Sequence, residues 1–275
     1  MENYLPISLL PIVSKVFERC VLNSIRDHLY HVSSPKQHGF CTGRSCVTNL
    51  LEAFDHIGSL LDSGSQVDTI YLDMSKAFDK VSHRHLIHKP IQASFGGNLL
   101  NWFCSYLSGR RQRVTVLGAT SEDLPVTSGP ALFLLYANDL FKVISSISRV
   151  LMFADDTKIF REIKTLGDAS SLQKDLGKLA TWSQSSGLLF NEAKYKAQHI
   201  TRKTRPILSS YKLNNTALEL YAAGKDLDVW ISKDLTWYKQ LNEQSLRAHK
   251  LLGYLKRNTR FTLRTDVRRT LYLQL

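Results

Sequence analysis

The sequence predicts an α+β protein, because short strand-like runs alternate with longer amphipathic helical segments. Two of the strand-like runs carry carboxylates at an end. Residues 69–73 close on Asp73, and residues 151–160 have two apolar arms around Asp155 and Asp156, which predicts a hairpin with the acidic pair in its turn. A lone carboxylate in such a place is often a helix cap or an ordinary turn residue. Two such segments together indicate a shared acidic cleft.

The other elements follow from the spacing of apolar residues and from helix-breaking residues. Helices are predicted at residues 14–30, 47–61, 85–107, 131–141 and about 169–187, with a basic helical tail from 238, and short strands at 113–117, 197–200 and 227–231. Pro90 and the Gly96-Gly97 pair divide the third helix into two pieces, and Gly187 ends the fifth.

Length and composition indicate a folded protein of about two domains, with 275 residues of which 43% are hydrophobic. No apolar run approaches the ~20 residues that a membrane helix needs, and the N-terminus lacks the charge pattern of a signal peptide. We therefore expect an intracellular protein, nuclear or cytoplasmic. The four cysteines form no CxxC pair, which argues against structural zinc and against a disulfide framework.

Positive charge is concentrated in the C-terminal quarter. Residues 201–275 hold 15 Lys and Arg against 6 Asp and Glu, which is +9 of the formal net charge of +12. The cations are interleaved with Tyr254, Phe261 and Tyr272. Basic residues mixed with aromatic ones are typical of a surface that follows a phosphate backbone, and a solvated helix face is the alternative.

Three carboxylates that converge from two strands repel one another, so the pattern predicts a divalent cation between them. Hard oxygen ligands of this kind favour Mg²⁺ or Mn²⁺. Two such ions about 3.5–4 Å apart activate an attacking oxygen and stabilise a leaving phosphate oxygen. Nucleotidyl transfer is therefore the predicted chemistry.

Seven blocks of the sequence, in order, resemble those of non-LTR (LINE-type) retrotransposon reverse transcriptases. They lie at residues 5–11, 37–40, 71–79, 134–140, 153–156, 187–194 and 229–237. The resemblance implies a right-hand polymerase fold with residues 1–66 as fingers, 67–237 as palm with inserted fingers helices, and 238–275 as the start of a basic helical thumb.

The resemblance also implies an RNA-directed DNA polymerase. Its partners would be an RNA template, a DNA primer and deoxynucleoside triphosphates, with Mg²⁺ or Mn²⁺ as cofactor and with no membrane or protein partner inferred. By match to the family's motifs, Asp73 would bind both metal ions, with the backbone carbonyl of Met74 as a further ligand. Asp155 would be the second metal-binding carboxylate, with Asp156 beside it.

Four further residues take expected roles from the same resemblance. Phe78 matches the ring that excludes a ribose 2′-hydroxyl, with a plain core residue as the alternative. Lys194 matches a lysine proposed to protonate the pyrophosphate leaving group, with an exposed lysine as the alternative. Arg44 and Lys15 lie in fingers blocks and are expected to bind triphosphate or template phosphates, unless they are simply solvated.

The chain departs from the family between Gly129 and Pro130. A motif B of the form VPQGSVLG is missing there, although both of its flanks are recognisable. Other departures are Leu5, Cys41, Pro90 and Asp228. The match begins inside the first fingers block and stops early in the thumb, without an endonuclease or RNase H region. We therefore expect a degenerate, truncated copy with impaired activity. The alternatives are a non-catalytic basic RNA/DNA-binding remnant and a reading frame that folds poorly.

Overall fold

The computed structural model describes residues 11–75, 77, 81, 83–109, 111–113, 115–116, 119–125, 130–259 and 264–273. Its helices are α1 (Ile12–Val32), α2 (Cys46–Asp62), α3 (His83–Gln92), α4 (Gly97–Leu107), α5 (Pro130–Ala137), α6 (Leu140–Val143), α7 (Leu166–Ser186), the 3-10 turn η1 (Glu192–Lys194), α8 (Tyr238–Thr259) and α9 (Thr265–Leu273). Its main strands are β1 (Gln66–Leu72), β6 (Arg149–Phe153), β7 (Asp156–Ile163), β8 (Lys196–Ile200), β11 (Glu219–Leu220), β12 (Ala223–Asp226) and β13 (Val229–Ser232). Shorter strands are β2 (Arg111–Gln112), β3 (Thr115–Val116), β4 (Ala119–Thr120), β5 (Leu124–Pro125), β9 (Lys212–Leu213) and β10 (Thr216–Ala217).

A five-stranded sheet in the order β11-β8-β1-β7-β6 forms the centre of the fold. The central strand β1 pairs antiparallel with both β8 and β7, and β6 forms a hairpin with β7. The short strand β11 joins β8 in parallel. Because β1 lies between two partners, the residue that follows it is held at one end of the sheet, next to the β6–β7 turn.

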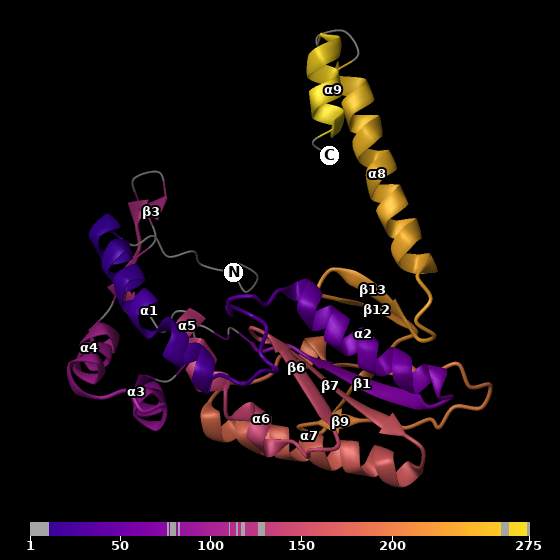
Figure 1. The fold of residues 1–275 in the computed structure, drawn as a ribbon, viewed down its shortest axis with the longest axis horizontal. Helices are drawn as coiled ribbons and strands as arrows, with labels where there is room; N and C mark the ends of the chain where they lie inside the picture. Colours follow the sequence, from indigo (N-terminus) through magenta and orange to yellow (C-terminus); the bar gives the residue numbers. More distant parts are fainter. Residues whose placement is uncertain are drawn as a thin grey trace.

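Different helices cover the two faces of this sheet (Figure 1). Alternation along β1 sends Ile70 and Leu72 to the face covered by α7, whose Leu172 belongs to the same apolar core. Val67 points to the opposite face and shares a second core with residues of α2 such as Ile57. The alternation therefore brings the side chain that follows Leu72 to the α2 face.

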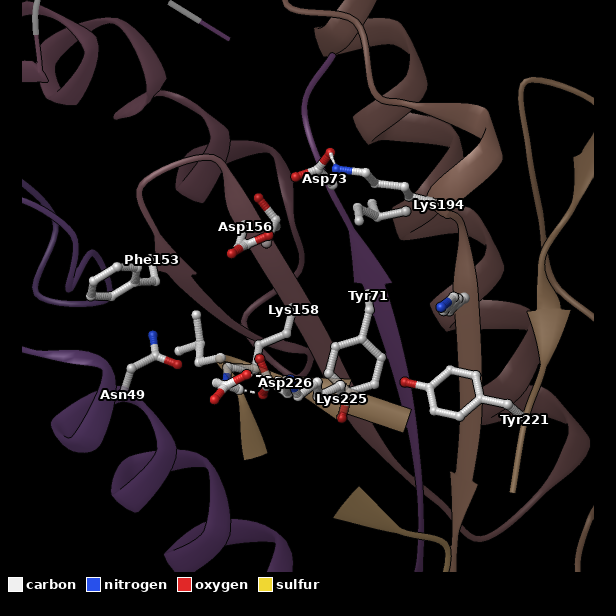
Figure 2. Close-up of a pocket in the computed structure, with 15 residues that line it drawn as sticks. Asn49, Tyr71, Asp73, Phe153, Asp156, Lys158, Lys194, Tyr221, Lys225 and Asp226 are labelled. Atoms are coloured by element: carbon white, nitrogen blue, oxygen red, sulfur yellow. Dashed lines mark hydrogen bonds and ion pairs between the residues drawn. The ribbon is translucent and has the colours of Figure 1, made fainter. Parts of the chain in front are cut away.

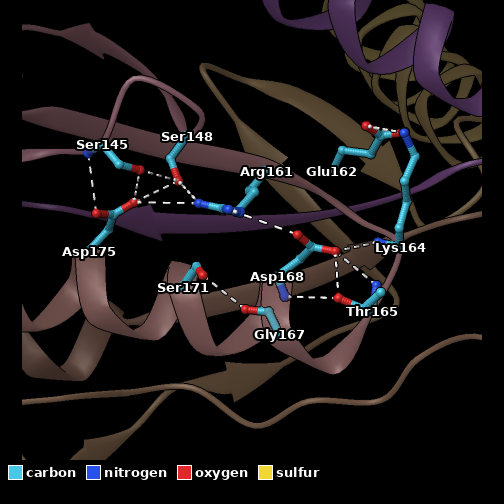
Figure 3. A network of polar contacts seen from close by, with 10 residues as sticks. All are labelled: Ser145, Ser148, Arg161, Glu162, Lys164, Thr165, Gly167, Asp168, Ser171 and Asp175. Carbon is cyan, nitrogen blue, oxygen red and sulfur yellow. Dashed lines mark hydrogen bonds and ion pairs between the residues drawn. The ribbon is translucent and has the colours of Figure 1, made fainter.

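A buried polar network fixes α7 against the β6–β7 hairpin (Figure 3). Arg161 of β7 lies 4.0 Å from Asp175 and 3.9 Å from Asp168, both on α7. Asp175 also accepts hydrogen bonds from Ser145 Oγ (2.5 Å) and Ser148 Oγ (2.7 Å). Burial alone would raise the pKa of Asp175, but these hydrogen bonds outweigh it and lower the pKa, so the carboxylate stays charged beside the guanidinium.

The helices α1, α3, α4 and α5 pack together at one side of the sheet (Figure 1). Aromatic rings join them: Phe95 contacts His28 of α1 at 4.7 Å and Phe103 of α4 at 5.7 Å between ring centroids. Such edge-on ring contacts stabilise a core beyond the area that they bury. The N-terminal part of α1 is less covered, and Phe17 remains 55% exposed.

Helix α8 projects from the body of the protein and contacts the sheet region through the β12–β13 hairpin (Figure 1). The backbone N–H of Trp230 donates to Gln240 Oε1 at 2.9 Å, and Lys239 Nζ lies 3.7 Å from the centroid of the Trp230 ring. The rest of the helix is largely exposed. The division into fingers, palm and thumb at residues 66 and 237 stays a prediction.

Most predicted elements are confirmed, namely the helices at residues 14–30, 47–61 and 169–187, the basic tail helix, the Asp-Asp hairpin and the strand at 197–200. Gly187 ends α7 with a φ of 76°, a left-handed conformation that glycine adopts without strain. At the other end of this helix, Thr165 and Asp168 form a capping box, which starts α7 before the first expected residue.

Several predicted boundaries are wrong, each because of a tertiary contact or a turn. Pro90 does not interrupt a helix but lies inside α3, and the break comes after Gln92. The helix expected at 131–141 ends at Ala137, because the side chain of Asn138 bonds Ser34 N (2.7 Å) and Val32 O (2.9 Å). Of the strand expected at 113–117, the described residues show only the short strand β3 at Thr115–Val116.

The strand expected at 227–231 is wrong at its start. Leu227 and Asp228 form the turn between β12 and β13, with φ values of 45° and 70°. A two-residue hairpin turn in which both φ values are positive favours Asn-Gly, because a side chain is strained there. The departure from glycine at Asp228 therefore falls at a position where glycine would remove strain.

Candidate active site

Asp73 and Asp156 come together where β1 ends and β7 begins. The last pair between these antiparallel strands is Leu72 with Thr157. One step further, the same register sets Asp73 beside Asp156, with both side chains on the α2 face of the sheet. Figure 2 shows the two side chains at the same end of the sheet.

Asp155 lies in the turn of the β6–β7 hairpin. Phe153 pairs with Asp156, so the two turn residues are Ala154 and Asp155. Ala154 has a φ of 57°, as tight hairpin turns require. The expectation that both aspartates lie in the turn is thus wrong for Asp156, which is the first residue of β7. One strand and one turn hold the two carboxylates on different backbone elements.

Burial and the charges of neighbouring carboxylates raise the pKa values of both Asp155 and Asp156. Burial and the charges of Asp155 and Asp73 together raise the pKa of Asp156 to about 7. Burial likewise raises the pKa of Asp155, with Asp73 again contributing and Lys194 opposing. The ionised cluster is therefore costly without positive charge nearby, as the sequence pattern predicted.

Lys194 supplies a positive charge at this cluster. Its Nζ donates to Asp73 Oδ2 at 2.7 Å, and this hydrogen bond is the main reason that the pKa of Lys194 is raised. The lysine ends the 3-10 turn η1, in which the backbone N–H of Ala193 donates to the side chain of Asn191. The backbone N–H of Asn191 also donates to the carbonyl of Asp73 at 2.7 Å. The chain thus ties the lysine to the aspartate by two contacts.

The carbonyl of Met74 faces the acidic cluster rather than the neighbouring segment. Met74 forms an antiparallel bridge with Phe190, in which Ser75 N donates to Leu189 O at 2.8 Å. In a bridge of this type the N–H and C=O of the bridged residue point away from its partner. The Met74 carbonyl therefore points to the side of β7, where the carboxylates lie.

Whether these groups fit a divalent cation can be judged from their chemistry. Among the residues that the structure describes, no three Asp, Glu, His or Cys side chains form a ready-made metal-binding group. The ammonium of Lys194 lies against Asp73 instead. The oxygen donors themselves are of the right kind, because two carboxylates with raised pKa values and a backbone carbonyl are hard ligands. The residues fit Mg²⁺ or Mn²⁺ once Lys194 and the carboxylates adjust.

A polar cavity of about 300 Å³ opens beside the cluster (Figure 2). Asp73, Asp156 and Lys194 line its upper part, and the rest is lined by residues of the central sheet, by Asn49 of α2, by Tyr221 and by the β12–β13 hairpin. At its base, Lys158 Nζ lies 2.5 Å from Asp226 Oδ2, and both side chains are more than 90% buried. The cavity therefore joins the acidic cluster to the hairpin that carries α8.

The other expected site residues lie in different surroundings. Arg44 donates from Nη1 to the carbonyls of Gln37 (2.7 Å) and Ser34 (3.1 Å), so part of its guanidinium braces the loop that precedes α2. Lys15 lies on the exposed N-terminal half of α1. Phe78 lies outside the described residues, as does the segment 126–129 that precedes the missing motif B. Their roles stay predictions.

Sequence reasoning missed three residues that shape the site: Gln37, Lys158 and Asp226. The signal for Lys158 was a lone charge within an apolar strand arm, which requires a buried partner. Gln37 was part of a recognised block without an assigned role. Asp226 precedes the β12–β13 turn and carries no local signal, because its partner is 68 residues away in sequence.

A mainly antiparallel sheet with carboxylates at the end of its central strand and in the adjoining hairpin is consistent with the fold of the right-hand nucleic acid polymerases. Residues 1–253 match the family model described as "Reverse transcriptase (RNA-dependent DNA polymerase)". The chain therefore belongs to the reverse transcriptase family, as the resemblance indicated. Enzymes of this family generally use divalent metal ions.

The chain is similar to curated proteins that are encoded by transposons. It is 27% identical over 292 residues to the "Probable RNA-directed DNA polymerase from transposon BS" of Drosophila melanogaster, covering 99% of this chain and 32% of the relative. It is 28% identical to the corresponding protein of transposon X-element, with the same coverage. The chain spans about a third of the length of these relatives. It is thus similar to the reverse transcriptase region of non-LTR retrotransposon proteins.

Two of the solved structures to which the chain shows a distant similarity are telomerases. The apo telomerase of Candida tropicalis truncated from its C-terminal domain has a TM-score of 0.49 and 12% identity, covering 82% of this chain and 44% of that one. The telomerase of Candida albicans, solved with a fragment of telomeric RNA, has a TM-score of 0.48 and 14% identity, covering 80% of this chain and 37% of that one.

None of the helices in the described part of this chain is both long and apolar enough to cross a bilayer.

Proposed function

We propose that the acidic end of the palm sheet is a nucleotidyl-transfer centre and that the chain acts as an RNA-directed DNA polymerase. The observation that carries this proposal is the meeting of Asp73 with Asp156 and Asp155, from a strand end and a hairpin turn, beside Lys194. A like-charge cluster of this kind, in which Asp73 and Asp155 are partly buried and Asp73 pairs with Lys194, is unfavourable for a purely structural role. It is suited to binding metal ions and phosphate.

Asp73, Asp155 and the Met74 carbonyl would hold the metal ions, with Asp156 beside them. Bound Mg²⁺ or Mn²⁺ would supply charge neutralisation at the attacking primer oxygen and at the leaving phosphate. The protein's own contribution is positional, because β1 and the β6–β7 turn fix the carboxylates on separate backbone elements. The substrates in this proposal are an RNA template, a DNA primer and deoxynucleoside triphosphates.

Lys194 would act at the leaving group. Its pKa is raised by the hydrogen bond to Asp73, so its Nζ carries a proton at neutral pH. If Asp73 bound a cation, its hydrogen bond to Lys194 would be given up, and the ammonium would then be available to neutralise or protonate a departing pyrophosphate. Phe78 as the sugar gate, and Arg44 and Lys15 as phosphate contacts, complete the proposal.

We further propose that the activity of this chain is impaired. The motif between Gly129 and Pro130 that would line the floor under template and incoming nucleotide is missing from the sequence. Without that floor the substrates are poorly oriented even if the carboxylates bind metal, and loss of orientation is costly for a transfer reaction. The centre is thus retained while its substrate platform is damaged.

A primer-extension assay on a primed RNA template tests both statements. The full chain is compared with a version that carries a VPQGSVLG segment between Gly129 and Pro130, each with and without Mg²⁺. We expect extension that needs Mg²⁺, weak in the chain itself and stronger in the restored version. Asp73→Ala and Asp155→Ala abolish it, whereas Asp62→Ala, an exposed carboxylate at the end of α2, leaves it unchanged. Extension that survives Asp73→Ala refutes the assignment.

A second candidate function is nucleic-acid binding without catalysis, favoured by the exposed cations of α8. Arg247, Lys250, Lys256 and Arg257 all lie exposed on this projecting helix. If four phosphates are neutralised on single-stranded RNA, the logarithm of affinity falls with the logarithm of salt at a slope of about −3. Such binding would be indifferent to Asp73→Ala, and a salt-independent affinity would rule it out.

A further inference from the structure

The side-chain amide of Gln37 is hydrogen-bonded to the turn that carries Asp155. This residue lies in the loop between α1 and α2 and is only 3% exposed. Its Oε1 accepts from the backbone N–H of Ala154 at 3.0 Å, and its Nε2 donates to the carbonyl of Ala154 at 3.2 Å. One side-chain amide therefore satisfies both backbone polar groups of a single turn residue, 117 positions away in sequence.

The gripped residue is the strained one of the turn. Ala154 has a φ of 57°, a left-handed conformation that non-glycine residues rarely adopt and that persists only where surrounding contacts hold it. Asp155 follows it directly, so the direction of the Asp155 carboxylate depends on the conformation of Ala154. The Gln37 amide is the contact that matches this conformation at both the N–H and the C=O.

The loop around Gln37 is itself held firmly against the hairpin. His38 N donates to Met152 O at 2.8 Å, and Met152 N donates to Lys36 O at 2.9 Å, so the loop adds a short parallel pairing to β6. Gly39 packs so closely that an added Cβ would lie 2.2 Å from Ala154 N. The approach of the loop to the turn therefore requires glycine at position 39.

Two further contacts orient Gln37 from behind. Its Oε1 also accepts from Gly39 N at 2.8 Å, which sets the direction of the amide group. Its backbone carbonyl accepts from Arg44 Nη1 at 2.7 Å. The side chain is thus fixed at both ends, and the alternative of an adaptable surface glutamine does not apply.

We propose that Gln37 is a positioning residue for the metal-binding turn: its amide holds Ala154 so that the Asp155 carboxylate meets Asp73. This inference rests on the proposed function, since the ion that Asp155 would bind belongs to that function. Gln37 touches neither metal nor substrate and acts only through Ala154. Partners that orient metal ligands in this way typically change metal affinity by about 10- to 100-fold when they are removed.

The test uses Gln37→Met in the full chain, because methionine keeps the length of the side chain and removes the amide. Mn²⁺ is titrated and followed by electron paramagnetic resonance, and amide exchange of Ala154 is followed by NMR. We expect Mn²⁺ binding weakened about 10-fold or more and faster exchange at Ala154. Gln37→Glu can still accept from the N–H groups of Gly39 and Ala154 but cannot donate to the Ala154 carbonyl. We therefore expect it to weaken Mn²⁺ binding less than Gln37→Met does.

Gln66→Met is the matched control. Gln66 is fully buried at the far end of β1, and its amide bonds both the N–H and the C=O of Ile207 at 2.8 Å. The same substitution at Gln66 removes an equivalent pair of hydrogen bonds and should lower the free energy of unfolding at least as much. It should leave Mn²⁺ affinity unchanged. If both variants weaken Mn²⁺ binding equally, the effect of Gln37 is general destabilisation and the proposal is overturned.

The remaining outcomes separate this inference from the proposed function. Wild-type protein that binds Mn²⁺ with the same affinity as Gln37→Met overturns the positioning role and leaves the proposed function intact. Wild-type protein that binds no Mn²⁺, with Asp155→Ala indistinguishable from it, overturns the proposed function. In that case unchanged exchange at Ala154 in Gln37→Met overturns the grip as well, and faster exchange supports it.

Discussion

The buried ion pair between Lys158 and Asp226 provides the sharpest test of how the site is held together. Lys158 lies on β7 two residues after Asp156, and Asp226 ends β12. Their side chains are 6% and 9% exposed, and Nζ lies 2.5 Å from Oδ2. This pair connects β7, the strand that begins with Asp156, to the β12–β13 hairpin that leads to α8.

The expected magnitude follows from burial. Removing one partner leaves an uncompensated charge in the interior, which costs about 3–5 kcal/mol. Replacing both partners by apolar residues of similar volume removes the charge and its desolvation together, and is often close to neutral. Lys158→Met and Asp226→Leu should each lose most of that amount, while the double variant should lose far less than their sum.

Urea unfolding followed by circular dichroism measures these free energies, and a double-mutant cycle isolates the pairwise part. The exposed pair of Arg202 and Asp62, 2.9 Å apart and 54% and 74% exposed, is the control. Its coupling should be about 0–1 kcal/mol. Single variants of the buried pair that cost under about 1 kcal/mol, or a double variant equal to the sum of the singles, would refute the reasoning.

Three further predictions concern charge and strain. Asp68 lies 2.8 Å from His199 Nδ1 and raises the pKa of His199. The stability that this ion pair contributes is therefore fully present below the unfolded pKa of 6.5 and is lost as pH rises through the folded pKa. Unfolding measured at several pH values should show this loss, and His199→Gln should abolish the pH dependence. Leu227→Asn should stabilise by about 1 kcal/mol in urea unfolding, because asparagine tolerates the positive φ of this turn. Asp156→Asn should raise the melting temperature in EDTA, because burial and the neighbouring carboxylates raise the pKa of Asp156 to about 7 and the amide carries no charge; a lower melting temperature would contradict this account.

The acidic centre could be predicted from sequence because its signals are local. A strand-like run that closes on Asp73 and a hairpin around Asp155 and Asp156 need only period-two alternation and turn chemistry to be recognised. The family's blocks then supplied the order in which those signals belong together. The one local error, the place of Asp156 at the start of β7, is a matter of a single residue in the turn.

The parts that failed depend on partners far away in sequence. Asn138 ends α5 because its amide bonds the backbone at Ser34 and Val32, more than 100 residues earlier. Periodicity carries no information about this contact, so the sequence alone places the end of α5 wrongly.

Contacts between residues that are far apart in sequence also explain how a strained, repulsive acidic centre persists in the fold. Mutual repulsion between Asp73, Asp155 and Asp156 favours any motion that swings the hairpin turn away from β1. The opposing contacts are made by neutral groups that do not titrate with the carboxylates: the Gln37 amide at Ala154 and the backbone bond from Asn191 N to the Asp73 carbonyl. Because these contacts hold backbone rather than carboxylate oxygens, they leave the oxygens available for cations. Such contacts fix the backbone at Ala154 and Asp73 and leave the carboxylate side chains to adjust, which favours the proposed metal-dependent transfer.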